Sequence, residues 1–159
     1  MTIKATQHLT LRLRLDYCNS LLAGISSTQL ARLQRLHNRS ARLITLTRSR
    51  EHITPILFDL HWLPFKLRVD FKVLVLAFKC LHGLAPPYLK LSFYSPPRSL
   101  RSSDSLRLTV PRTKRAIGDN AFSSMAPRLW NDLPLAIRTA STLSAFRSSL
   151  KTHLFKSHF

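Results

Sequence analysis

The chain has 159 residues, of which 45% are hydrophobic, and its 25 lysines and arginines stand against 7 acidic residues. This length suggests one domain, and the hydrophobic content argues against wholesale disorder. A formal net charge of +18 makes the compact state repel itself. A polyanionic partner relieves that repulsion, and nucleic acid is the commonest one. The alternative interpretation is a generic basic protein that adheres to any anionic surface.

The two cysteines, Cys18 and Cys80, are too few for a disulfide framework and belong to no Cys-x-x-Cys or Cys/His cluster. We expect them to be buried free thiols. The longest apolar run, Val73 to Phe78, is far shorter than a membrane span. The N-terminus has no signal-peptide core. These features predict an intracellular protein, nuclear or cytoplasmic, with no membrane partner.

A first long helix is predicted before Thr47, with an N-cap in the cluster Ser26-Ser27-Thr28. Its apolar positions recur at spacings of three and four and share one face. They are Leu30, Leu33, His37, Ala41 and Ile44. Arginines recur at the same spacings on the opposite face, so the helix carries an arginine stripe. They are Arg32, Arg35, Arg39 and Arg42.

Two further helices are predicted between Thr54 and Gly83. Thr54 is the expected cap of the first, with Pro55 in its first turn, and Pro64 ends it by disfavouring helical geometry at the preceding residue. A longer helix from Phe65 to His82, stopped by Gly83, should be central and nearly buried. Its expected apolar face is formed by Phe71, Leu74, Val75, Phe78 and Leu81.

Residues 92–105 hold six serines, two prolines and two arginines, which predicts a mobile loop. Apolar and polar residues alternate over the following stretch from Leu106 to Val110, which predicts a short strand. Beyond it, Asn120 is a candidate cap for a helix through Met125. Ser141 or Ser144 is a candidate cap for a terminal helix. That helix has its apolar face at Leu143, Phe146, Leu150, Leu154 and Phe155.

Signatures of chemistry are missing from the sequence. Polymerases and many nucleases hold metal ions with clustered carboxylates, whereas no two of the seven acidic residues lie within three positions of each other. Three glycines cannot build a glycine-rich phosphate cradle. His61 could be catalytic, yet beside Trp62 and Pro64 a packed or capping role is favoured. We therefore expect the protein to have no enzymatic activity, no cofactor and no metal site.

Several motifs, taken in order, resemble the region that follows the polymerase core of LINE-type (non-LTR) retrotransposon reverse transcriptases, including the jockey-like mobile-element polymerases. They are 15–24 (LDYCNSLLAG), 33–44 (LQRLHNRSARLI), 52–55 (HITP), 60–64 (LHWLP), 78–89 (FKCLHGLAPPYL), 99–103 (SLRSS), 126–134 (APRLWNDLP) and 146–155. Each motif is weak by itself, and the ordered series is specific. The resemblance covers residues 15–155 and leaves residues 1–14 unmatched.

The resemblance implies a parent protein that copies element RNA into DNA at a nicked target, with metal-binding aspartates upstream. Those aspartates and the endonuclease have no counterpart in this chain. It implies a non-catalytic remnant, equivalent to the thumb and tail after the palm, that grips nucleic acid. The alternatives are an independent basic interaction or structural protein, and a genomic fossil without a selected function.

The expected fold is mainly α, a small helical domain with a minor β element and a Ser/Pro/Arg-rich loop. Its expected segments are an unmatched N-terminus (1–14), a helical region with the striped helix (15–91), the mobile loop (92–105), and a short strand with C-terminal helices (106–159). The expected core residues are Leu33, Ile44, Leu57, Trp62, Phe71, Leu74, Phe78, Leu81, Trp130 and Phe146. Tryptophans and most phenylalanines are expected in the core rather than as base-stacking platforms.

The expected partner is the backbone of RNA or DNA, bound without sequence preference, with the remaining reverse transcriptase domains as a further partner. The four stripe arginines are one group of candidate nucleic-acid-binding residues. The second group is Arg98, Arg101, Arg112, Lys114 and Arg115.

Overall fold

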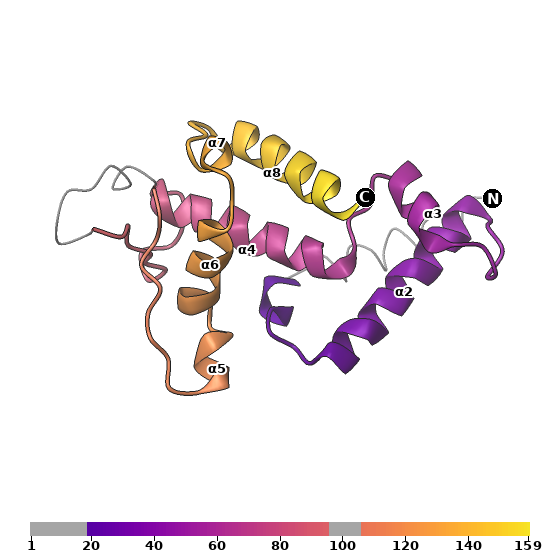
Figure 1. Cartoon of the computed structure of the whole chain (residues 1–159), viewed down its shortest axis with the longest axis horizontal. Helices are drawn as coiled ribbons and strands as arrows, with labels where there is room; N and C mark the ends of the chain where they lie inside the picture. The colour runs from indigo at the N-terminus through magenta and orange to yellow at the C-terminus, as the bar shows by residue number, and fades with distance from the viewer. Residues whose placement is uncertain (1–18, 96–105) are drawn as a thin grey trace. The chain divides into compact units, whose positions relative to one another are not determined.

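The structure is a computed structural model, and it describes residues 19–95 and 106–159 (Figure 1). The described chain is mainly α-helical, which confirms the expected fold class. It begins with a short 3-10 helix, η1 (Asn19–Leu22), and continues with the helices α2 (Ser27–Thr45), α3 (Ile53–Asp59), α4 (Phe65–Leu81), α5 (Ala116–Asp119), α6 (Phe122–Asn131), α7 (Leu135–Arg138) and α8 (Leu143–His158). The unmatched segment 1–14, Cys18 and most of the expected mobile loop lie outside the described residues.

The chain divides into two compact units. The first contains residues 19–69 and 154–159, and the second contains residues 70–95 and 106–153, among those described. The boundaries fall inside α4 and α8. These two units are defined by contacts in space. The four segments expected from the sequence (1–14, 15–91, 92–105 and 106–159) are a division along the chain, and they stay predictions.

In the first unit, α2 packs against α3. Ser26 caps α2 as expected, because its side chain accepts a hydrogen bond from the Gln29 amide. A small core joins Ala41 of α2 to Ile56 and Leu57 of α3 and to Trp62 beyond it. The cap of α3 is His52, whose ring accepts from the Thr54 amide, so the expectation of a Thr54 cap was wrong by two residues.

Three of the helix ends use a left-handed residue. Gly83 ends α4 with φ 69°, as expected of glycine. Leu46 ends α2 with φ 55°, and the Thr47 amide donates to the Arg42 carbonyl at 3.0 Å. His61 follows α3 with φ 52°. Helices α2 and α3 are therefore followed by Leu46 and His61 in a left-handed conformation that glycine adopts more readily.

The buried face of α4 differs from the expected one. Leu74 and Phe78 are buried as predicted, whereas Phe71 and Leu81 are only half-buried. Val73 and Ala77, expected on other faces, are at most 1% exposed. Because apolar residues occur on several sides of α4, its periodicity does not fix which side faces the core.

The core of the second unit is built around stacked rings. Phe146 of α8 stacks on Phe78 of α4 at a centroid distance of 4.5 Å and on Trp130 of α6 at 5.6 Å. Phe146 and Leu150 are fully buried. The expected apolar face of the terminal helix is therefore confirmed at its centre. Its cap is Thr142, which accepts from the Ala145 amide, in place of the expected Ser141 or Ser144.

The predicted strand over Leu106 to Val110 is reduced to one antiparallel bridge between Leu108 and Phe93. On its other side, the Asn131 carboxamide accepts from the Leu108 amide at 2.8 Å and donates to the Leu108 carbonyl at 2.9 Å. The indole of Trp130 donates to the Leu106 carbonyl at 2.9 Å. One helix end thus supplies the hydrogen bonds that a second strand would otherwise give.

The expectation of an Asn120 cap was wrong. Asn120 is the C-cap of α5, and α6 begins after Ala121, which makes no side-chain cap hydrogen bond. The helix runs past Met125 to Asn131 and contains Pro127, which is buried.

Candidate nucleic-acid interface

Helix α2 presents three arginines, Arg32, Arg35 and Arg39, on its solvent side, and all three are exposed. We call these three residues the α2 arginine face. Among the described residues, no side-chain hydrogen bond or ion pair is formed by any of the three. The rise from Arg32 to Arg39 is about 10 Å at the pitch of an α-helix. The three residues are thus exposed basic positions on one helix.

The fourth stripe residue, Arg42, has a different environment. It is half-buried, and its Nη2 donates to the Glu51 carbonyl at 3.0 Å. Glu51 precedes α3, so this hydrogen bond ties the α2–α3 connection to the end of α2. The structure therefore separates Arg42, which supports the fold, from the three arginines that reach solvent.

The orientation of α2 is fixed by its opposite face. The side chain of Gln34 accepts from the Phe65 amide at 2.7 Å. The ring of His37 stacks on Trp62 at a centroid distance of 5.1 Å, and its Nε2 lies 3.1 Å from the Leu63 carbonyl. Two of the motifs quoted from the sequence, 33–44 and 60–64, therefore meet here.

The partners of His37 define its tautomer. A carbonyl oxygen only accepts, so Nε2 must carry the proton that is donated to Leu63. Nδ1 is then the acceptor for the Arg68 guanidinium, which lies 3.3 Å away. His37 is 2% exposed. It is thus a buried structural histidine. Its contacts fix the side of α2 that lies opposite the α2 arginine face.

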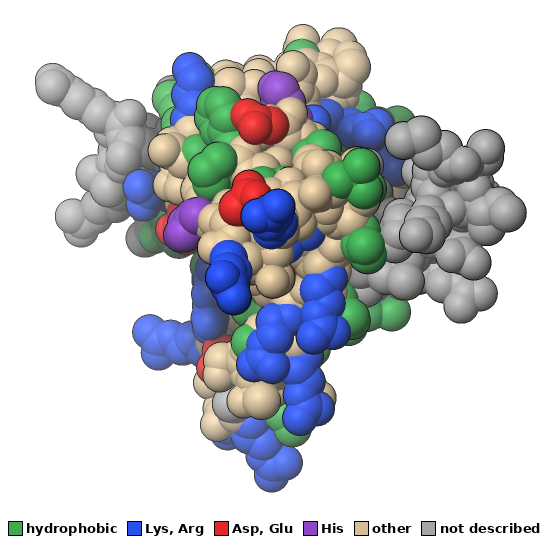
Figure 2. Space-filling model, turned by 90° about the vertical axis from the view of Figure 1, so that its right-hand side faces the viewer, with side chains coloured by type: hydrophobic (Ala, Val, Ile, Leu, Met, Phe, Trp, Pro, Cys, Tyr) green, Lys and Arg blue, Asp and Glu red, His purple; other side chains and the backbone are tan. Residues whose placement is uncertain are grey.

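Basic residues dominate the first unit. Its described residues hold nine lysines and arginines against two acids, Glu51 and Asp59, and helix α2 contains no acid at all. Lys and Arg side chains of the whole molecule are drawn blue in Figure 2, where several are visible on the face shown. Such an excess raises the local concentration of a polyanion and steers its approach.

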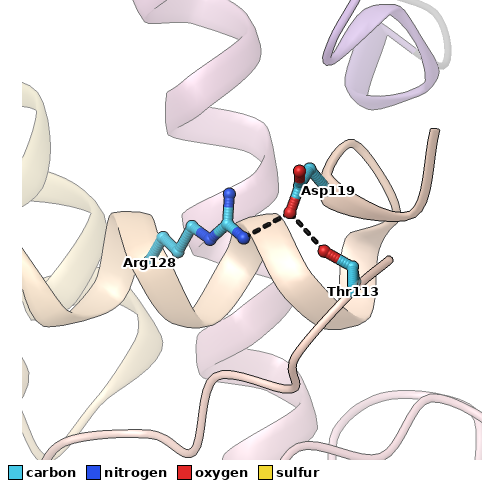
Figure 3. Close-up of polar contacts among 3 residues, drawn as sticks. All are labelled: Thr113, Asp119 and Arg128. Carbon is cyan, nitrogen blue, oxygen red and sulfur yellow. Dashed lines mark hydrogen bonds and ion pairs between the residues drawn. The ribbon is translucent and has the colours of Figure 1, made fainter. Parts of the chain in front are cut away.

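The second group of sequence-predicted residues lies in the other unit. Arg112, Lys114 and Arg115 are exposed before α5, whereas Arg98 and Arg101 lie outside the described residues. Beside the three exposed residues, the Thr113 hydroxyl and the Arg128 guanidinium both donate to Asp119 Oδ1 (Figure 3). These hydrogen bonds, from Thr113 first and Arg128 second, hold the pKa of Asp119 below its ordinary value. These hydrogen bonds connect the basic segment 112–115 and α5 to Arg128 of α6.

His61, the one histidine considered for catalysis, has contacts that suit a capping role. Its Nδ1 lies 3.2 Å from the Asp59 carbonyl, and its backbone ends α3. Within the described ranges, no three His, Cys, Asp or Glu side chains gather as ligands for one metal ion. Cys80 is a half-buried thiol whose pKa is raised by burial.

Exposed aromatic residues were missed at the sequence level. Phe58 is 50% exposed and Phe159 is 36% exposed, and both contact Phe155. The sequence placed most phenylalanines in the core because they fall in apolar patterns. A pattern shows which residues share a face, and it does not show whether another element covers that face.

In comparisons with known proteins, no family model, no curated protein and no solved structure matches this chain. Across the residues that the structure describes, no helix combines the length and apolar character needed to cross a membrane.

Proposed function

We propose that this chain is a non-catalytic remnant of a LINE-type reverse transcriptase and that it binds nucleic-acid backbone through the α2 arginine face. The observation that carries the binding is the exposure of Arg32, Arg35 and Arg39 on an acid-free helix, without partners among the described residues. Support for the origin is the ordered motif series along the sequence.

The chemistry of the arginine face suits phosphate. A guanidinium presents its donors as a planar fork that matches two phosphate oxygens, whereas an ammonium is a point charge. Three arginines on successive turns can engage several phosphates of one strand, and each contact releases condensed counterions. Backbone contacts carry no direct base readout, so the binding is expected to lack sequence preference.

Several companion expectations belong to the same proposal. The partner is RNA or DNA, with the remaining reverse transcriptase domains as a further partner where they are present. The protein acts inside the cell, in the nucleus or the cytoplasm. The chain performs no polymerase or nuclease chemistry itself, because its sequence lacks clustered carboxylates.

The salt dependence of binding tests the proposal. We expect the full chain to bind a labelled DNA duplex with an affinity that falls steeply with salt. Replacing Arg32, Arg35 and Arg39 with glutamine removes three phosphate contacts, so the log–log salt slope should fall by about 2.7 units. Glutamine is a similar helix former to arginine, so α2 should persist.

A matched control removes the same charge from exposed helical positions elsewhere. The triple variant Lys72→Gln, Arg147→Gln, Lys151→Gln also loses three positive charges. The proposal requires this control to keep most of the salt slope. Equal slopes for the two triple variants would show that α2 is only a solvated face, and absence of duplex binding by the unmodified chain would end the proposal.

A further inference from the structure

The first unit carries a cluster of aromatic rings at its surface. Phe58, at the end of α3, lies 5.3 Å from Phe155 and 5.7 Å from Phe159, measured between ring centroids. Phe155 and Phe159 are 4.7 Å apart. The ring of His61 stacks on Phe155 at 5.8 Å with an interplanar angle of 14°. We call Phe58, Phe155 and Phe159 the phenylalanine cluster.

The phenylalanine cluster is incompletely covered. Half of the Phe58 side chain and about a third of Phe159 face solvent, with values of 50% and 36%. Exposed aromatic surface of this kind costs free energy, because apolar area is more stable when it is removed from water. A partner that covers the rings recovers that free energy.

Charge limits what this partner can be. The nine lysines and arginines of the described first unit oppose only two acids, and Lys156 is exposed beside Phe155 in the chain. An anionic partner is therefore favoured over a neutral or basic one. The partner must also offer flat apolar faces to the rings. A single-stranded nucleic acid meets both conditions, because its bases have free π faces and its backbone is anionic.

We propose that the phenylalanine cluster is a stacking platform for unpaired nucleobases, so that the chain prefers single-stranded to double-stranded nucleic acid. This inference rests on the proposed function and names its substrate class. In a duplex the base faces are stacked on one another, so the cluster gains nothing there. In a single strand the rings contact bases, while basic side chains of the same unit contact phosphates.

An abasic oligonucleotide separates the two kinds of contact, because it keeps the phosphates and lacks the bases. We expect the full chain to bind a labelled oligothymidylate at least about fivefold more tightly than an abasic strand of equal length at the same salt. Failure of both strands and of the duplex to bind would overturn the proposed function, whereas binding of the duplex alone would overturn the stacking platform. Equal binding of both strands would overturn only the stacking platform.

Variants then assign the preference to the cluster. The double variant Phe58→Leu, Phe159→Leu keeps apolar volume and removes two rings, so the preference for oligothymidylate should fall below about twofold while abasic binding is unchanged. Phe93→Leu is the matched control, because Phe93 is 49% exposed and lies in the other unit. An equal loss in this control would overturn the assignment.

Two other measurements, made on the unmodified chain and on the double variant, can also contradict the inference. Vesicles of phosphatidylserine test a lipid surface, and light scattering tests a second copy of the chain. If the double variant loses vesicle binding or self-association and retains the base preference, the cluster serves that other partner. The comparison of base-bearing and abasic strands uses the unmodified chain, so it decides the question even where a variant does not fold.

Discussion

The carboxamide of Asn131 satisfies both backbone groups of Leu108, with N···O distances of 2.8 Å and 2.9 Å. Leu108 is 2% exposed, so neither group has ready access to water. The neighbouring backbone groups bond to the other side, where the Tyr94 amide donates to the Arg107 carbonyl at 2.8 Å. A single side chain thereby bonds to the edge of Leu108 that faces away from its bridge with Phe93.

Replacing Asn131 with leucine should destabilise the folded protein. The variant keeps side-chain volume and leaves two backbone groups of Leu108 without partners, so the free energy of unfolding should fall by about 2–3 kcal/mol. Urea denaturation followed by circular dichroism measures the change. Asp132→Asn, at the exposed neighbouring position, should stay within about 0.5 kcal/mol. Comparable losses in the two variants would contradict the pairing.

His37 should be required for stability rather than for binding. His37→Phe preserves a ring against Trp62 and removes the hydrogen bond to the Leu63 carbonyl and the acceptor for Arg68. A loss of about 1–3 kcal/mol in unfolding free energy is expected, with nucleic-acid affinity unchanged below the melting transition. His153→Phe, at a half-exposed position without a described partner, is the control. A stable variant that loses binding would show that His37 contacts the ligand.

Arg39 and Arg42 should contribute differently to binding. Arg39→Gln should lower the log–log salt slope on duplex DNA by about 0.9. Arg42→Gln should lower it less and should reduce stability instead, because Arg42 donates to the Glu51 carbonyl. Salt titrations and urea melts of the two single variants check this division. Equal slope changes with equal stability would place both arginines at the phosphate backbone.

Asp119 should confer a pH dependence on the second unit. Its pKa is depressed in the folded state, so its stabilising contribution is present above its unfolded pKa and is lost as the pH falls through the lower folded value. Thr113→Val removes the largest cause of this shift and should raise the pKa of Asp119. A carbon-13 NMR titration of the carboxyl group measures it. An unchanged midpoint would mean that Thr113 does not hold the carboxylate in solution.

The isolated chain should show no template-dependent polymerisation. Polymerases stabilise the transferring phosphoryl group with metal ions held by clustered carboxylates, and the sequence contains no such cluster. Primer extension with magnesium and with manganese is the measurement, beside a buffer control. Incorporation above that control would require a catalytic site assembled from acids distant in the sequence.

Local signals in the sequence predicted the long helices well. The Ser26 cap, the repeat of apolar positions in α2 and the glycine after α4 each depend on residues close in the chain. Ile44 shows where such signals fail, because it shares the apolar face of α2 and is still 46% exposed. The partner helix α3 has only seven residues. It covers α2 around Ala41, and a face is buried only where another element reaches it.

Non-local contacts were beyond the reach of one sequence. Asn120 was expected to cap a helix because asparagine favours N-caps, whereas the following residue, Ala121, occupies that position without a side-chain hydrogen bond. The pairing of Asn131 with Leu108 spans 23 positions in the chain. For the candidate interface, periodicity placed four arginines on one face, and Arg42 differs from the other three by its partial burial and its contact with Glu51.

The end of α2 has a consequence for engineering. Leu46 adopts a left-handed backbone that costs an L-residue roughly 1–2 kcal/mol, and its side chain is 79% exposed, so packing offsets little of that cost. Glycine would occupy the same conformation without the steric penalty. Natural chains retain such unoptimised positions because selection maintains a threshold and not a maximum. Replacing Leu46 with glycine should thus stabilise the helix that carries the arginine face. That gain in stability would offset destabilising substitutions made in the same helix.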